Sequence, residues 1–315
     1  MAVQKIINAE RVKRHGSCLI NIDYLLPILK KVREDRITLN YERGNTIQIF
    51  AGSGRYDIEA AVSDSTPLKF VLPNEVYSVS GINKLLTFPI LTSSCVDKLI
   101  YQCIFISLSE DAARSFTFDG TRFFSYKTDA CVSSGEFNMV LHTVCARMLS
   151  HILKDSETYY VGATKDKLLI INNNLTCCIN QIGIPKTEPV SITAKIKPAY
   201  SFRVDAEKLL RALASINVSS KRLENSDALL RAENGDLSLY SYSQEVSSKA
   251  VIHLSDSQVN IPDFIYNSNY LTEYVSKCTG DINVNICKDG KLMLESALCT
   301  YIMPCISSAS GYAAA

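Results

Sequence analysis

The sequence lacks an excess of either charge: 33 Lys and Arg residues are balanced by 32 Asp and Glu residues, which gives a formal net charge of +1. This balance argues against a protein that binds nucleic acid through general basicity, although it permits a local basic lining. No apolar run is long enough to span a membrane, and the N-terminus, MAVQKIINAERVKRHG, lacks the apolar core of a signal peptide. We therefore expect a cytoplasmic protein.

Cysteine is plentiful but lacks the spacing of a bridged or metal-bound framework. The eleven cysteines are an odd number, include the adjacent pair Cys177 and Cys178, and form no CxxC motif. This usage is typical of reduced, mostly buried thiols in a cytosolic compartment. We expect no metal site and no cofactor.

The common catalytic motifs are also missing. There is no G-x-S-x-G, H-E-x-x-H, Walker-type loop or dinucleotide fingerprint, and the glycines of Ala51–Asp57 lie between two predicted strands. Cys145 lies near His142 and His151, which would suit a thiol nucleophile with a base. All three fall within a predicted helix, however, and nothing in the pattern activates the thiol. Catalysis is the weaker alternative, and we expect a protein that is not an enzyme.

What the chain does contain is a repeated unit. Its 315 residues, 47% hydrophobic and 21% charged, predict a globular protein of two or three domains. A helix, a strand, a turn and two further strands recur at intervals of roughly 60 residues. We predict five such units, whose helices begin near residues 22, 79, 137, 204 and 267. Helices alternating with runs of short antiparallel strands indicate an α+β fold.

Two proline-bearing connections divide these units. They are Asp64–Glu75 (DSTPLKFVLPNE) and Gly183–Tyr200 (GIPKTEPVSITAKIKPAY). Such segments break helices and suit linkers or edge strands. The predicted domains are therefore 1–72, with one unit, and 73–195 and 196–315, with two units each.

The stretch Thr117–Tyr126 (TFDGTRFFSY) places an Asp-Gly pair between two β-prone runs. This pattern predicts a β-hairpin whose Asp119-Gly120 pair supplies the positive φ angles of a type I′ turn. A hairpin alone would account for the motif. On that interpretation Arg122 forms a surface ion pair and has no further role.

Three motifs together resemble those of the bacterial sliding clamp, the beta subunit of DNA polymerase III. FDGTRF at 118–123, YNSNYL at 266–271 and TYIMP at 300–304 occur in the order and domains of that family's TDGHRL-like, FNxxYL-like and YxxMP-like motifs. The segment from Gly16 through Ala60 resembles the second half of the family's first domain. The resemblance implies a DNA-clamp fold of three domains, of which the first lacks its first half.

In that family the hairpin borders a surface pocket where short partner peptides dock. The resemblance implies apolar walls and a few polar groups that fix the peptide. Phe118, Thr121 and Phe123 replace the usual Thr, His and Leu, and Cys305 also departs from the pattern. Ordinary core packing is the alternative for each Phe and for Met303. The implied pocket residues are Phe118, Gly120, Thr121, Arg122, Phe123, Asn267, Tyr270, Met303, Pro304 and Cys305.

Clamps of this family encircle duplex DNA, with helices facing the hole. Lys and Arg on those helices would contact phosphates without sequence preference. A merely solvated helix face is the alternative for each of them. The implied DNA-facing residues are Lys30, Lys31, Arg33, Lys84, Arg147, Lys208 and Arg211. The implied contact between two copies uses Tyr56 and Ile58 on one side and Ile216 and Val218 on the other, with buried core as an equal alternative.

The implied function is that of a processivity factor. Its expected partners are duplex DNA, the polymerase III alpha subunit, the clamp loader, other proteins with a clamp-binding motif, and a second copy in a homodimeric ring. Because the first domain lacks one unit, a second interpretation stays open. The chain could be a truncated or diverged clamp that binds peptides without encircling DNA.

Overall fold

The computed structural model describes residues 1–13, 16, 18–42, 45–61, 70–89, 98–128, 135–183, 197–220, 227–242, 247–255, 260–288 and 290–308. The chain divides into two compact units, one of Ile6–Val71 and one of Met1–Lys5 together with Leu72–Ala315. Most of the two predicted linkers, at 62–69 and 184–196, lies outside the described residues.

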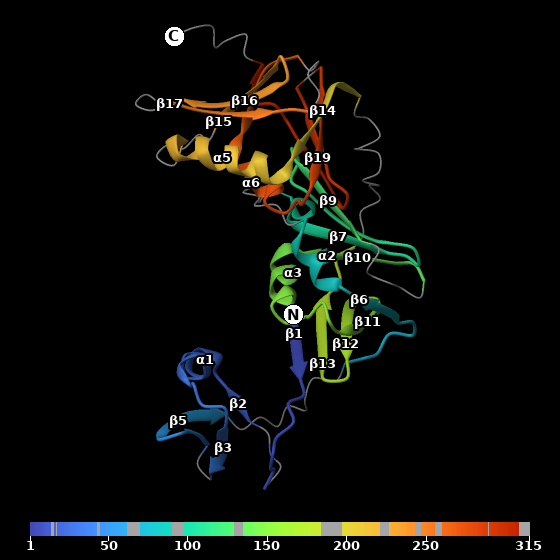
Figure 1. Cartoon of the computed structure of the whole chain (residues 1–315). Coiled ribbons are helices and arrows are strands. Elements are labelled where there is room, and N and C mark those ends of the chain that lie inside the picture. The colour runs from blue at the N-terminus through green and yellow to red at the C-terminus, as the bar shows by residue number, and fades with distance from the viewer. Residues whose placement is uncertain are drawn as a thin grey trace. The chain divides into compact units, whose positions relative to one another are not determined.

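The repeat is a strand, a helix and three antiparallel strands, and the described residues contain it five times (Figure 1). The first copy is β2 (Leu19–Ile20), α1 (Ile22–Lys31), β3 (Ile37–Glu42), β4 (Thr46–Ala51) and β5 (Gly54–Ala61). The second is β6 (Tyr77–Ser80), α2 (Ile82–Thr87), β7 (Cys103–Leu108), β8 (Ala113–Phe118) and β9 (Phe123–Thr128), with a short 3-10 turn, η1 (Leu99–Gln102), before β7. The third is β10 (Phe137–His142), α3 (Thr143–Ser150), β11 (Thr158–Ala163), β12 (Lys167–Asn172) and β13 (Leu175–Asn180).

The last two copies follow the same order. The fourth is β14 (Pro198–Asp205), α5 (Ala206–Ser220), β15 (Asp227–Glu233), β16 (Asp236–Tyr242) and β17 (Ser247–His253). The fifth is β18 (Ile261–Asn267), α6 (Ser268–Val275), β19 (Asp281–Cys287), β20 (Leu292–Glu295) and β21 (Cys299–Met303). Short strands β1 (Ala2–Lys5) and β22 (Ser307–Ser308) complete the sheets.

The strand that opens each copy is absent from the sequence prediction, and in one place the prediction is wrong. The pattern predicts that a helix begins at residue 137, but residues 137–142 form β10, which pairs with β7. Met139, Val140 and Leu141 are all buried, and a short apolar run of this kind suits a buried strand as well as a helix. The helix begins only at Thr143. His142 caps it, because its ring accepts a hydrogen bond from the Val144 N–H at 3.2 Å.

Within residues 72–308, copies pair by exchanging their first strands. β6 pairs with β11 and β10 with β7, while β14 pairs with β19 and β18 with β15. Helices pack in the same pairs, α2 on α3 and α5 on α6. An eight-stranded sheet in the order β10-β7-β8-β9-β21-β20-β19-β14 joins the second copy to the fifth. The segments predicted as domains 73–195 and 196–315 therefore share this sheet, and most of their buried apolar residues form one cluster.

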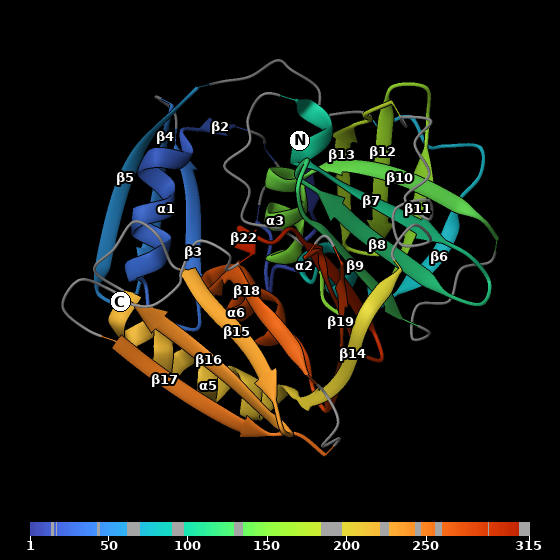
Figure 2. The same ribbon diagram turned by 90° about the horizontal axis from the view of Figure 1, so that it is seen from above.

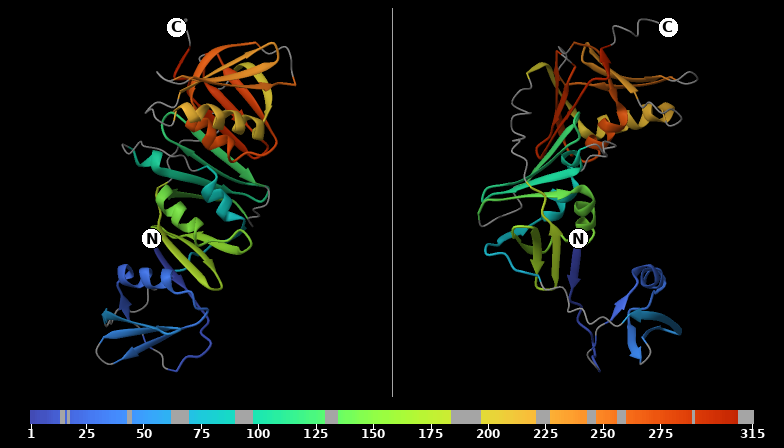
Figure 3. Two further views of the ribbon diagram at one scale, coloured as in Figure 1. Left: turned by 60° about the vertical axis from the view of Figure 1, so that its left-hand side comes forward. Right: turned by 180° about the vertical axis from the view of Figure 1, so that it is seen from behind.

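The helices of this unit pack against its sheets. α3, α5 and α6 lie on one side of the eight-stranded sheet, in both the front and the rear view (Figure 1; Figure 3, right panel). α5 packs on the sheet that contains β16 and β17 (Figure 2). No helix in the described part of the chain is both long enough and apolar enough to cross a membrane.

The first five residues do not belong with the segment that follows them. β1 pairs antiparallel with β13, from Ala2 opposite Cys178 to Lys5 opposite Leu175. It thereby forms the edge strand of the sheet β1-β13-β12-β11-β6. The predicted domain of residues 1–72 therefore starts too early. The four residues of β1 form their hydrogen bonds with β13, which is distant in the sequence, and a local sequence pattern does not reveal such a pairing.

Candidate peptide-binding site

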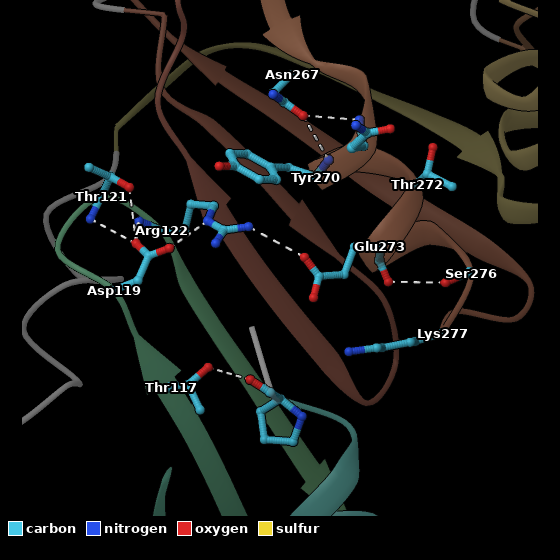
Figure 4. A network of polar contacts seen from close by, with 12 residues as sticks. Thr117, Asp119, Thr121, Arg122, Asn267, Tyr270, Thr272, Glu273, Ser276 and Lys277 are labelled. Carbon is cyan, nitrogen blue, oxygen red and sulfur yellow. Dashed lines mark hydrogen bonds and ion pairs between the residues drawn. The ribbon is translucent and has the colours of Figure 1, made fainter. Parts of the chain in front are cut away.

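Three segments that lie far apart in the sequence meet at the loop between β8 and β9. β9 pairs with β21, which places Phe123 opposite Ile302. α6 begins beside them, and the Arg122 guanidinium lies 3.7 Å from the centre of the Tyr270 ring (Figure 4). The hairpin motif, the start of α6 and the end of β21 therefore form one site.

The hairpin prediction is confirmed, but the turn type is wrong. Phe118 pairs with Phe123, so the loop has four residues, and of Asp119 and Gly120 only the glycine has a positive φ, of 98°. The Asp119 carboxylate closes the loop by accepting hydrogen bonds from the backbone N–H groups of Thr121 at 3.0 Å and Arg122 at 2.7 Å. This side-chain closure replaces the two-residue turn.

Arg122 is buried, with only 2% of its side chain exposed. Its Nε donates to Asp119 Oδ2 at 2.6 Å, and an Nη donates to Glu273 Oε2 of α6 at 3.3 Å (Figure 4). The prediction of Arg122 as a surface group that a peptide reaches is corrected, because its donors point into the protein. Arg122 instead joins the hairpin to α6.

A second cation, Lys277, links the end of α6 to residues of the second copy of the repeat. Lys277, just after α6, donates through Nζ to the backbone carbonyl of Phe88 at 2.7 Å and lies 4.7 Å from the centre of the Phe124 ring. Burial lowers the pKa of Lys277. Glu273 in α6 and Lys277 just past its end therefore both make polar contacts to the preceding part of the chain.

The charge on Asp119 is stabilised by its surroundings. Burial on its own would raise the pKa of this carboxyl, but the N–H groups of Arg122 and Thr121 and the Arg122 charge outweigh that effect and lower the pKa. A group whose pKa is lower when folded adds stability above its unfolded pKa, and this stability is lost as the pH falls through the folded pKa.

We therefore expect the free energy of unfolding to fall as the pH is lowered from about 5 to about 2, with Asp119 as one contributor. In Asp119→Asn the curve of unfolding free energy against pH should be flatter over that range, because one titrating group is gone. Urea unfolding at a series of pH values measures this slope. Asp57→Asn, at a half-exposed carboxylate, is the control. Equal slopes for Asp119→Asn and the wild type would contradict the assignment.

The other implied pocket residues divide into buried and accessible groups. Phe123 and Met303 lie in the core, as the alternative interpretation had it, and Phe118 packs edge-on against Tyr101. Asn267 caps α6 by accepting hydrogen bonds from the N–H groups of Asn269 and Tyr270. The accessible members are Gly120, Thr121 and Pro304, which are exposed, and Phe118, Asn267, Tyr270 and Cys305, which are half-buried.

Three residues at the site, Glu273, Lys277 and Tyr101, are not among those that the motifs imply. Glu273 could have been found, because it follows Tyr270 by three residues on a predicted helix and so faces the same way. Tyr101 gave no such signal. It belongs to the short turn η1, and a Cβ added to Gly120 would come within 3.2 Å of its ring.

The cations predicted to face DNA are all exposed, and six of them lie on helices. Lys30 and Lys31 are on α1, Lys84 is on α2 and Arg147 is on α3. Arg33 follows the end of α1 and is not helical. On α5, Lys208 is exposed, and Arg211 forms an ion pair with Glu207 one turn away.

Two of the four predicted interface residues are core residues in this chain. Ile58 and Ile216 are 5% and 0% exposed, so their side chains leave almost no surface for a partner. Tyr56 is half-buried on β5, and Val218 lies near the end of α5. The interface itself stays a prediction.

The residues of the enzymatic alternative lie along α3. His142 and His151 are the residues that flank the two ends of this helix, and Cys145 lies inside it. The His142 ring also contacts the Gln102 side chain, with 2.9 Å between Nε2 and Oε1. The His142 imidazole thus caps the start of α3. Among the described residues, no three side chains of the metal-binding types lie close enough together to hold a metal ion.

The fold is that of solved bacterial sliding clamps. The chain matches a DNA polymerase III beta chain of Streptococcus pneumoniae with a TM-score of 0.81 and 14% identity, over 97% of this chain and 86% of that one. It matches the beta subunit of Thermotoga maritima with a TM-score of 0.80 and 14% identity, over 97% and 85%. The Helicobacter pylori beta clamp bound to a DNA ligase peptide gives 0.78 and 14%, over 97% and 86%.

This chain therefore has the sliding-clamp fold, which confirms the predicted α+β clamp architecture. No protein-family model matches the chain, and no curated protein matches it in sequence.

Proposed function

We propose that this protein is a non-catalytic sliding clamp, which surrounds duplex DNA in the cytoplasm together with a second copy and tethers a polymerase and other proteins through their peptides. The observation that carries the proposal is the meeting of three clamp-like motifs at one place on a clamp fold. Exposed cations on α2, α3 and α5 supply the charge that sequence-independent contact with phosphates requires.

A second function is favoured by one observation. The unit of residues 6–71 contains one copy of the repeat, whereas the described residues from 72 onward pair their four copies two by two. A chain with a single copy in this unit could keep the peptide site and yet fail to close around DNA. On this alternative the protein is a peptide-binding module of clamp fold.

Topological retention separates the two functions. The protein is loaded by a bacterial clamp loader onto a nicked circular plasmid, separated from free protein by gel filtration, and then treated with an enzyme that linearises the plasmid. A clamp stays on the circle and leaves the linear form, because a ring slides off free ends. Equal retention on both forms, or none on either, would refute encirclement.

The peptide site is tested by a change on its accessible side. We expect Pro304→Arg to weaken binding of a fluorescent peptide, with the sequence of a polymerase's clamp-binding segment, at least about tenfold, because a charged side chain would enter a small apolar site. Anisotropy titration measures the affinity. Pro262→Arg changes an exposed proline on β18 and is the matched control. Equal losses in both variants would contradict the assigned site.

A further inference from the structure

Two cysteines meet where α6 ends, in a cluster that the proposed function does not use. Cys278 lies just beyond the end of α6, and Cys299 is the first residue of β21. Ser296 lies between them: its Oγ is 3.7 Å from Cys278 Sγ and accepts a hydrogen bond from the Cys299 N–H at 3.2 Å. The two thiols also form a hydrogen bond with each other. Both are free thiols, so the cluster contains two reduced sulfur atoms side by side.

The cluster favours the thiolate form of Cys278. The hydrogen bond from the Cys299 thiol lowers the pKa of Cys278, and the Lys277 ammonium adds to this effect, against the opposing effect of burial. The same hydrogen bond raises the pKa of Cys299, which burial raises further. Of the two thiols, Cys278 is therefore the one that loses its proton first. The thiolate is the nucleophilic form of cysteine, so Cys278 is the reactive member of the pair.

The two thiols also differ in access to solvent. Cys278 is half-buried, whereas only 3% of Cys299 is exposed. Thr279 and Gly280, which follow Cys278, are exposed, and a Cβ added to Gly280 would meet nothing within 4 Å. The segment after Cys278 therefore has room to adjust. An accessible thiol of lowered pKa beside a second, resolving thiol is the arrangement of redox-sensing cysteines.

We propose that Cys278 and Cys299 are a peroxide-sensitive pair that forms a reversible disulfide. The Cys278 thiolate attacks one oxygen of hydrogen peroxide, the O–O bond breaks, and Cys278 becomes a sulfenic acid. The leaving hydroxide takes up the proton that Cys278 released and becomes water. The Cys299 sulfur then attacks the Cys278 sulfur, and the hydroxyl group leaves as a second water with the Cys299 proton. The two thiols are oxidised, the peroxide is reduced, and a thiol reductant restores the pair by exchange.

Thiol mapping of the full chain tests the pair. The reduced protein is treated with a small excess of hydrogen peroxide, the remaining thiols are blocked with N-ethylmaleimide, and the digest is analysed by mass spectrometry. We expect a peptide that joins positions 278 and 299 and is lost on treatment with dithiothreitol. In Cys299→Ser the reaction should stop at the Cys278 sulfenic acid, which dimedone traps. Cys145→Ser, at another half-buried cysteine, is the control and should form the link like the wild type. Circular dichroism shows whether each variant is folded.

Three results would overturn the proposal. The first is a wild-type protein that forms no link between positions 278 and 299. The second is a link that joins other cysteines in its place, such as Cys287 and Cys305. The third is oxidation of Cys278 in the wild type to the sulfinic acid while Cys299 still reacts with N-ethylmaleimide, because Cys299 would then not act as the resolving thiol. None of these results depends on DNA binding, peptide binding or the proposed clamp function.

Discussion

Replacing Lys84, Arg147 and Lys208 together with glutamate is expected to weaken the binding of duplex DNA at least about tenfold at low salt. These cations are exposed on α2, α3 and α5. Each phosphate contact that is lost also lowers the dependence of log affinity on log salt concentration by about 0.9. Anisotropy of a labelled duplex, titrated at several salt concentrations, measures both quantities.

The matched control reverses three cations on the strands of the same unit, by Arg114→Glu, Lys127→Glu and Arg203→Glu. All three are exposed on the eight-stranded sheet, where they alternate with buried residues such as Ala113, Tyr126 and Phe202. Their side chains therefore leave the sheet on the face away from its core. A loss of affinity as large as that of the helix variant would show that DNA contact is not confined to the helices.

Arg122→Ala is expected to lower the free energy of unfolding by about 3–5 kcal/mol, because it removes one partner of a buried ion network. The side chains of Asp119 and Glu273 are 6% and 15% exposed, so their carboxylates would lose an ion-pair partner and remain poorly solvated. The Tyr270 ring would also lose the cation stacked on it. Urea unfolding, followed by circular dichroism at neutral pH, measures the change.

Arg231→Ala is the control for that experiment, since it too removes an arginine paired with an aspartate. Arg231 lies on β15 and pairs with Asp263, but 45% of its side chain is exposed. A surface pair of this kind contributes about 0–1 kcal/mol. If Arg122→Ala cost no more than Arg231→Ala, the buried network would not stabilise the junction between the hairpin and α6.

Much of the fold could be predicted from the sequence because the repeat is long and its helices are amphipathic. Five helices and their following strands emerged from periodicity, and all five are present. The opening strands did not emerge, since most of them gain their hydrogen bonds by pairing with another copy of the repeat. Residues 137–142 show the difficulty: an apolar run beside a helix fits either structure until its hydrogen-bond partner β7 is known.

The motif residues lie together in the structure, but the position of the central residue, Arg122, differs from the prediction. Sequence motifs indicated that the hairpin and the start of α6 belong together. They could not indicate that Arg122 is buried, because its burial depends on Glu273, which lies 151 positions away. Ile58 and Ile216 illustrate the same limit, as an apolar side chain near a strand or helix end can face either a partner or the core.

The strand β1 has a consequence for how this protein resists aggregation. It covers the outer edge of β13, where unpaired N–H and C=O groups beside Cys177 and Cys178 would otherwise be a template for another chain. Side-chain packing adds little to its attachment, because three of its four residues are exposed. Brief detachment of these residues would expose the unpaired edge of β13 while the core stays folded. Resistance to aggregation would then be set by local opening at Ala2–Lys5 more than by the stability of the whole domain.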